Sequence, residues 1–152
     1  EIVDCIVLLD IIEHLINPTI ILDEAKRSLK KGGLLIITTP NLAMLYNRIF
    51  LLFGWSFSNY HTCIYKTGNP FLKIKNVGNL WNENAHKSVF TFEELKELIK
   101  DVYKFNILGL TGFSYSNTFA TGSDSTYGGF RKYLNWVIPN SLKEGILLIA
   151  KK

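Results

Sequence analysis

Three polar residues with the chemistry of a functional site, Asp10, Glu13 and His14, directly follow an apolar run over residues 2–9. Side chains at positions i and i+3 of a helical turn share a face, so the two carboxylates can converge with the imidazole beside them. Such a set suits a hard or borderline divalent ion. The same residues can instead be structural, with Glu13 accepting hydrogen bonds from neighbouring amides and His14 packing under a sheet edge. We expect the structural role, and no metal ion is predicted.

Other polar residues farther along the chain are candidates for the reaction and its substrate. His86 is the predicted general base, because a neutral imidazole can take a proton from a hydroxyl near neutral pH. Its alternative role is to hydrogen-bond its own loop. The Asn41 amide can orient a substrate, or it can cap the turn after Pro40. Tyr46 and Arg48 lie in an aromatic-rich stretch and are predicted to contact an apolar or glycan-bearing substrate.

A strand, a helix and a second strand must position these residues. The run over residues 2–9 shows no alternation, which is typical of a strand buried on both faces, and Cys5 within it is predicted to be a core residue. A helix follows up to Leu29, and residues 34–38 form a second buried strand. This order predicts a right-handed crossover and parallel neighbours. Open parallel sheets bind ligands beyond the carboxyl ends of their strands, which is where Asp10 lies.

The helix boundaries are marked by capping residues. The Asn-Pro pair at residues 17–18 predicts the start of the first helix, and Gly32 or Gly33 predicts its end. Thr91 and Glu94 form a predicted capping box for a later helix. The apolar face of that helix is predicted to comprise Leu95, Leu98, Ile99 and Val102.

The remaining segments are predicted to form two further strands of the sheet and a long substrate cover. Residues 105–113 and 145–151 are predicted to be two further strands. Residues 42–85 are rich in aromatic side chains, and a segment this long between sheet elements is usually a lid or a binding loop. We therefore expect one domain over residues 1–152, with residues 42–85 as a substrate cover.

Three sequence blocks carry a family resemblance. The pattern D-x-I-x-L-L-D-x-I-E-H-L-x-x-P begins at Asp4, R-x-L-K-x-G-G-x-L-I-I-T-T-P-N begins at Arg27, and HKSVFTFEEL begins at His86. Together they resemble the second half of a Rossmann-like, class I, S-adenosylmethionine-dependent methyltransferase. The resemblance implies an α/β fold, in which a mostly parallel sheet has an antiparallel C-terminal strand. Only the second half of that sheet is expected in this chain.

The resemblance also implies a cofactor and its contacts. S-adenosylmethionine is the expected cofactor, and Leu8, Leu9 and Asp10 would line its pocket. The family often carries a histidine near the cleft mouth at the position of His86. Some relatives bind a metal through E-x-x-E-H, but Asp10 replaces the first Glu here, so the set Asp10, Glu13 and His14 is only a minor alternative. The Gly-rich loop of the family, D-x-G-x-G-x-G, is absent from the sequence, so the chain is expected to be a fragment that is inactive alone.

The function implied is transfer of a methyl group to a small-molecule, glycan or lipid-like acceptor, with oxygen as the methylated atom. The alternative is a non-catalytic or truncated half-domain that needs upstream sequence or a partner. A nicotinamide oxidoreductase on a related fold would require G-x-G-x-x-G after its first strand. The E-H-L-x-x-P and G-G-x-L-I-I-T-T-P-N blocks favour methyl transfer instead.

Composition limits the partners and the location. The net charge is only +4, and no basic stripe runs beside exposed aromatic residues, so no nucleic acid partner is expected. No apolar run reaches the roughly 18 residues of a membrane span. The cysteines show no disulfide framework, so a cytoplasmic location is expected, with peripheral membrane attachment left open. If residues 2–9 form an exposed apolar edge strand, self-association through it is expected.

Overall fold

The computed structural model describes residues 2–55, 86–114 and 137–152. Its opening β-α-β unit consists of strand β1 (Val3–Leu9), helix α1 (Thr19–Ser28) and strand β2 (Leu29–Pro40). β1 and β2 are parallel, as predicted, and Leu8 is paired with Ile37. A non-alternating apolar stretch on each side of one amphipathic helix therefore produces the expected parallel pair.

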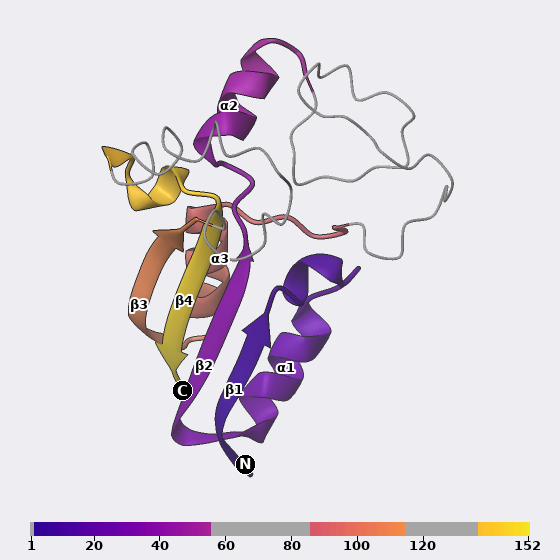
Figure 1. Ribbon diagram of the computed structural model, residues 1–152. Helices are drawn as coiled ribbons and strands as arrows, with labels where there is room; N and C mark the ends of the chain where they lie inside the picture. The colour runs from indigo at the N-terminus through magenta and orange to yellow at the C-terminus, as the bar shows by residue number, and fades with distance from the viewer. Residues whose placement is uncertain (1, 56–85, 115–136) are drawn as a thin grey trace, which may run out of the picture.

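Two further strands complete a four-stranded sheet in the described part of the chain, namely β3 (Asn106–Phe113) and β4 (Gly145–Lys151). The strand order is β1-β2-β4-β3 (Figure 1). Because β4 is antiparallel to both of its neighbours, β1, β2 and β3 all run in the same direction. The predicted fold class, a mostly parallel sheet with an antiparallel C-terminal strand, is confirmed. We call the edge of the sheet where β1, β2 and β3 end the carboxyl edge.

Short helical segments connect these strands. They are η1 (Ile12–His14), α2 (Leu45–Leu52), α3 (Phe92–Glu97), η2 (Leu98–Val102) and η4 (Asn140–Leu142). Within the described segments, no helix has the length and apolar character needed to cross a membrane. Most of the predicted cover, residues 56–85, lies outside the described residues, so its role stays a prediction.

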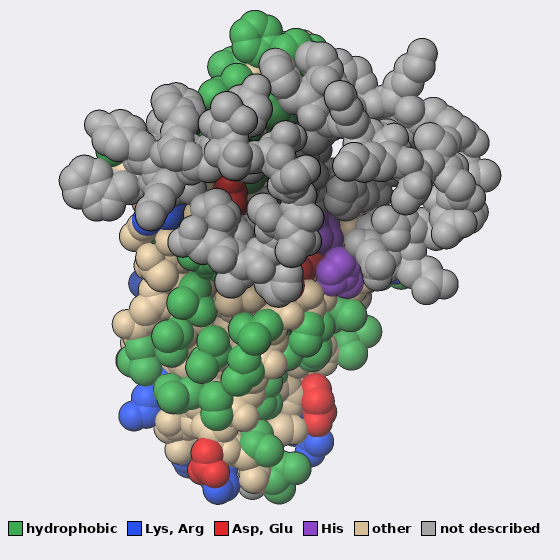
Figure 2. All heavy atoms as spheres, viewed as in Figure 1, with side chains coloured by type: hydrophobic (Ala, Val, Ile, Leu, Met, Phe, Trp, Pro, Cys, Tyr) green, Lys and Arg blue, Asp and Glu red, His purple; other side chains and the backbone are tan. Residues whose placement is uncertain are grey.

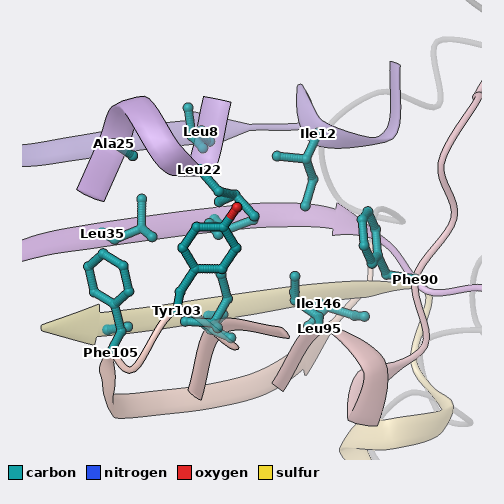
Figure 3. Close-up of a cluster of buried hydrophobic side chains, with 14 of the residues drawn as sticks. Leu8, Ile12, Leu22, Ala25, Leu35, Phe90, Leu95, Tyr103, Phe105 and Ile146 are labelled. Atoms are coloured by element: carbon teal, nitrogen blue, oxygen red, sulfur yellow. The ribbon is translucent and has the colours of Figure 1, made fainter. Parts of the chain in front are cut away.

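The hydrophobic core lies between one face of the sheet and the helices α1, α3 and η2. Figure 3 shows Leu22 and Ala25 of α1 and Leu95 of α3 in one cluster with Leu35 of β2 and Ile146 of β4. All five side chains are at most 2% exposed. This packing fixes α1 and α3 against the sheet and so sets the positions of the loops that they flank.

Tyr103 joins η2 to α1 within the helices that cover the sheet. Its hydroxyl donates to the backbone oxygen of Thr19 at 3.1 Å and lies 3.0 Å from Asp23 Oδ1. Burial raises the pKa of the Tyr103 phenol to about 12, and the Asp23 carboxylate adds to this shift. The residue that follows η2 is therefore attached to the first turn of α1.

The prediction that β1 is buried on both faces is wrong. Leu8 is buried, but Val7 and Leu9 are 48% and 57% exposed, and Cys5 is exposed rather than in the core. In the part of the chain that the structure describes, the helices cover one face of the sheet, and β1 forms an edge. Figure 2 shows hydrophobic side chains gathered over the strands on the viewed face. Self-association through this strand stays a prediction.

The predicted extent of α1 up to Leu29 is confirmed, but its N-cap is Pro18 and not Asn17, and the predicted role of Gly32 is wrong. Asn17 Oδ1 accepts hydrogen bonds from the Thr19 amide at 3.1 Å and from the Thr19 hydroxyl at 2.6 Å. The helix ends at Ser28 and the chain passes directly into β2. Gly32, with φ +82°, lies inside β2, where the pairing with β1 is irregular. The positive φ of Gly32 therefore serves a bulge and not a helix end.

The predicted capping box of α3 is confirmed. Thr91 Oγ1 accepts from the Glu94 amide at 3.2 Å, and Glu94 Oε2 accepts from the Thr91 amide at 2.8 Å. Leu95 and Ile99 are buried as expected, but Val102 is 65% exposed. The helix continues as a π-helical turn in η2, and its wider residue spacing moves Val102 away from the core.

Candidate functional site

The chain turns sharply at the end of β1. Asp10 has a left-handed backbone with φ 50°, a conformation that Asp tolerates better than most residues. Its amide lies 3.1 Å from the backbone oxygen of Thr38 and 3.0 Å from Thr38 Oγ1. The Thr38 hydroxyl donates to Asp10 Oδ1 at 3.0 Å. These contacts join the ends of β1 and β2 at the carboxyl edge.

The three residues predicted to bind the cofactor lie in different surroundings. Leu8 is 5% exposed and belongs to the core, so its side chain is not available to a ligand. Leu9 is 57% exposed, and Asp10 is also exposed. The structure therefore leaves the Leu9 and Asp10 side chains, and only the backbone of Leu8, for contact with a cofactor.

Glu13 is a buried acid in η1, directly after this turn. It is 1% exposed, and its Oε2 accepts a hydrogen bond from the Thr39 hydroxyl at 3.1 Å. Its Oε1 is buried and has no hydrogen-bond partner among the described residues. Burial raises the pKa of the Glu13 carboxyl above its ordinary value, and the charge of Asp10 adds to the shift. The Thr39 hydrogen bond acts in the opposite direction.

Backbone hydrogen bonds bring His86 to this acid. The amides of Lys87 and Ser88 both donate to the backbone oxygen of Glu13, at 2.7 and 3.0 Å. The rings of His14 and His86 consequently lie edge to face, with centroids 4.9 Å apart. His14 Nε2 is 3.9 Å from Glu13 Oε1, and the buried His14 Nδ1 has no hydrogen-bond partner in the described ranges.

Glu13, His14 and His86 form the group that we call the Glu-His-His cluster. One potential ligand atom from each residue lies within 4.8 Å of the other two. The minor alternative for a metal set, Asp10, Glu13 and His14, is therefore not the cluster that the structure shows. The left-handed turn and the bonds to Thr38 hold Asp10 at the end of β1, whereas His86 takes the third position.

Asn41 makes the hydrogen bonds expected of its structural role. It is 0% exposed, and its Nδ2 donates to the backbone oxygens of Ser141 at 2.8 Å and Lys143 at 2.9 Å. Its Oδ1 accepts from the Ala43 amide at 3.0 Å. The side chain therefore joins the end of β2 to the turn that contains η4. These contacts favour the capping role, and the role of Asn41 toward a substrate stays a prediction.

The two predicted substrate contacts lie on α2. Arg48 is exposed, and its Nε donates to the backbone oxygen of Ala43 at 2.8 Å, whereas Tyr46 is partly exposed. The intervening Asn47 is 0% exposed and donates to the backbone oxygen of Leu42 at 2.8 Å. α2 is thereby attached to the end of β2, and the role of Tyr46 and Arg48 toward a substrate stays a prediction.

The sequence interpretation missed Thr38 and Thr39. Both belong to the I-I-T-T-P block, and each contacts one of the acids at the carboxyl edge. Alternation along β2 places Thr39 on the same face as the buried residues Leu35 and Ile37. A hydroxyl on a buried strand face needs a polar partner, and that was the available signal for the contact with Glu13.

Comparison with known proteins places the chain in a family. A family model described as "Methyltransferase domain" matches residues 1–102. A solved structure described as a SAM dependent methyltransferase from Archaeoglobus fulgidus is 16% identical, with a TM-score of 0.47, and the similarity covers 99% of this chain and 60% of that one. The chain thus spans about 60% of the length of that protein, and no curated protein matches it. Because the family match covers more than half of its residues, the chain belongs to the methyltransferase-domain family, as the resemblance to class I methyltransferases predicted.

Proposed function

We propose that this chain contributes the second half of a cofactor site in an enzyme that methylates a small-molecule, glycan or lipid-like acceptor at oxygen. The proposed methyl donor is S-adenosylmethionine. Membership of the family supports the type of reaction. The arrangement of the sheet supports the place of the site, because β1 and β2 are parallel and both end at the carboxyl edge. Open α/β sheets bind their ligands at that edge.

The observation that carries the proposal is the conformation at the end of β1. The turn at Asp10, joined to Thr38 through backbone and side chain, ends the strand and leaves Leu9 57% exposed at the edge. An apolar side chain on such a rigid support suits contact with an adenine ring or a methionine chain. The sequence holds no D-x-G-x-G-x-G loop, so the remaining cofactor contacts are proposed to come from outside these residues.

In this proposal the residues of the chain mainly bind and orient. S-adenosylmethionine supplies a methyl group on a sulfonium centre that is already a good leaving group. Leu9 and Asp10 hold the cofactor in position, and alignment of the two reactants accounts for most of the acceleration. His86 is the proposed base for the acceptor hydroxyl. Tyr46 and Arg48 are the proposed contacts to the acceptor.

A non-catalytic half-domain is the second candidate. The absence of the Gly-rich loop from the sequence favours it. In that case the exposed Leu9 and Val7 would be covered by other sequence or by a partner, and no cofactor would bind at the carboxyl edge.

Nuclear magnetic resonance can separate these candidates. S-adenosylhomocysteine, at millimolar concentration to detect weak binding, is added to the 152-residue chain labelled with ¹⁵N. We expect amide shifts that saturate and centre on Leu9 and Asp10. Leu9→Arg should abolish them, because it places a charge against the apolar part of the ligand. The matched control is Val102→Arg, at an exposed apolar residue in η2.

Each outcome decides between the candidates. Shifts at the end of β1 that Leu9→Arg removes and Val102→Arg retains support the cofactor site. Spectra that do not change at any concentration of the ligand, or shifts that Leu9→Arg leaves intact, would overturn it in favour of the half-domain.

A further inference from the structure

The geometry points to a binding site for one divalent cation in the Glu-His-His cluster, formed by Glu13, His14 and His86. These residues come from two segments that lie 72 positions apart and meet beside the end of β2. The inference goes beyond methyl transfer, because it concerns a second ligand with its own contacts. It also replaces the sequence-based expectation that no metal binds.

The buried Glu13 carboxyl group lacks one of its partners among the described residues. The group is almost fully enclosed, with 1% exposure of the residue, yet only Oε2 has a hydrogen bond. A buried polar atom without a partner costs free energy, and such atoms are uncommon in folded proteins. Oε1 is the carboxyl oxygen that faces His14, at 3.9 Å from Nε2. A cation between them would supply the missing partner.

The potential ligand atoms are spaced closely enough to share one ion. They lie within 4.8 Å of one another. Ligands at metal distances of 2.0 to 2.1 Å in a tetrahedron are about 3.4 Å apart, so small side-chain rotations would close the site. The backbones that carry the three residues are already joined, because Lys87 and Ser88 both donate to the backbone oxygen of Glu13. Binding therefore requires no rearrangement of the fold.

The ligand atoms of the cluster determine which kind of cation it would bind. Two imidazole nitrogens and one carboxylate oxygen suit zinc and similar borderline ions, whereas magnesium and calcium prefer oxygen ligands. Three protein ligands leave a fourth tetrahedral position open for water or a substrate atom. A nitrogen of His86 that binds the ion could not also accept a proton, so this site and the proposed general base exclude each other at that atom.

Calorimetric titration of ZnCl₂ into the 152-residue chain tests the inference, with MgCl₂ as the comparison ion. We expect one zinc ion per chain and no detectable heat from magnesium. His86→Ala should weaken zinc binding by more than about tenfold, because losing even a group that only orients a ligand costs about 10–100-fold. The matched control is Glu97→Gln, which removes an exposed carboxylate of α3 outside the cluster and should leave the affinity unchanged.

A spectroscopic measurement on the unmodified chain covers the case in which a variant fails to fold. Co²⁺ in place of zinc should give the intense visible bands of a tetrahedral site. Equal zinc affinity in the unmodified chain and His86→Ala, loss of binding in Glu97→Gln, or weak octahedral cobalt bands would each overturn the inference. None of these readouts depends on S-adenosylmethionine, so failure of the metal site and failure of the methyltransferase proposal are distinguishable.

Discussion

Replacement of Asn41 by Asp tests whether this residue supports the fold at the carboxyl edge. Asn41 Nδ2 donates to two backbone oxygens, those of Ser141 and Lys143, at 2.8 and 2.9 Å. An ionised carboxylate has no proton to donate, so the oxygen that replaces Nδ2 would face both carbonyl oxygens without a hydrogen bond. Losing a buried hydrogen bond and leaving its partner unsatisfied costs about 1–3 kcal/mol. Two such losses at a residue that is 0% exposed predict a decrease of about 2–6 kcal/mol in the free energy of unfolding.

Urea denaturation followed by circular dichroism measures this change. The matched control is Asn17→Asp, because Asn17 is exposed and uses only its Oδ1, as an acceptor from Thr19. A carboxylate retains that acceptor and favours a helix start, so we expect a change within about 0.5 kcal/mol. Equal stability of Asn41→Asp and the unmodified chain would refute the reasoning and restore substrate orientation as the role of Asn41.

Two further predictions concern the core and the turn next to it. Gly112→Ala should lower the free energy of unfolding by about 3 kcal/mol, because an added Cβ would overlap the backbone of Asn140. The control is Gly109→Ala in the same strand, whose added Cβ meets no atom within 4 Å and should change the free energy of unfolding little. Thermal melting of both variants measures the difference. The Tyr103 phenol should titrate near pH 12 by phenolate absorbance, and Tyr103→Phe should remove that late phase. Since its folded pKa of about 12 lies above the ordinary 10.0, its stabilising contribution is present below pH 10.0 and is lost as the pH rises toward 12. A titration that ends without a late phase in the unmodified chain would contradict the second prediction.

Local sequence patterns predicted the elements whose causes are local. The capping box at Thr91 and Glu94 is a contact between residues three apart, and its side chains and amides meet as predicted. The bounds of β4 and the antiparallel end of the sheet are also confirmed. The same patterns assigned Gly32 to the end of α1 although it lies inside β2, because a glycine with positive φ can serve a helix end or a strand bulge equally well.

Burial was the least predictable property. A run without alternation predicted that β1 is covered on both faces, yet Val7 and Leu9 are about half exposed. Composition reports how apolar a strand is, but its exposure depends on which elements pack against each face. Among the described residues, the helices pack on one face only.

The sequence by itself determined the family of the chain, the β-α-β order and the placement of acidic residues after the first strand. Those features depend on residues close together along the chain. Only the tertiary structure decided which polar residues meet: Thr39 and His86 reach Glu13 from other segments, and Asn41 turns inward to the η4 turn. The physical reason is that hydrogen bonds between distant segments, such as those from Lys87 and Ser88 to the Glu13 carbonyl, leave no periodic trace in the sequence.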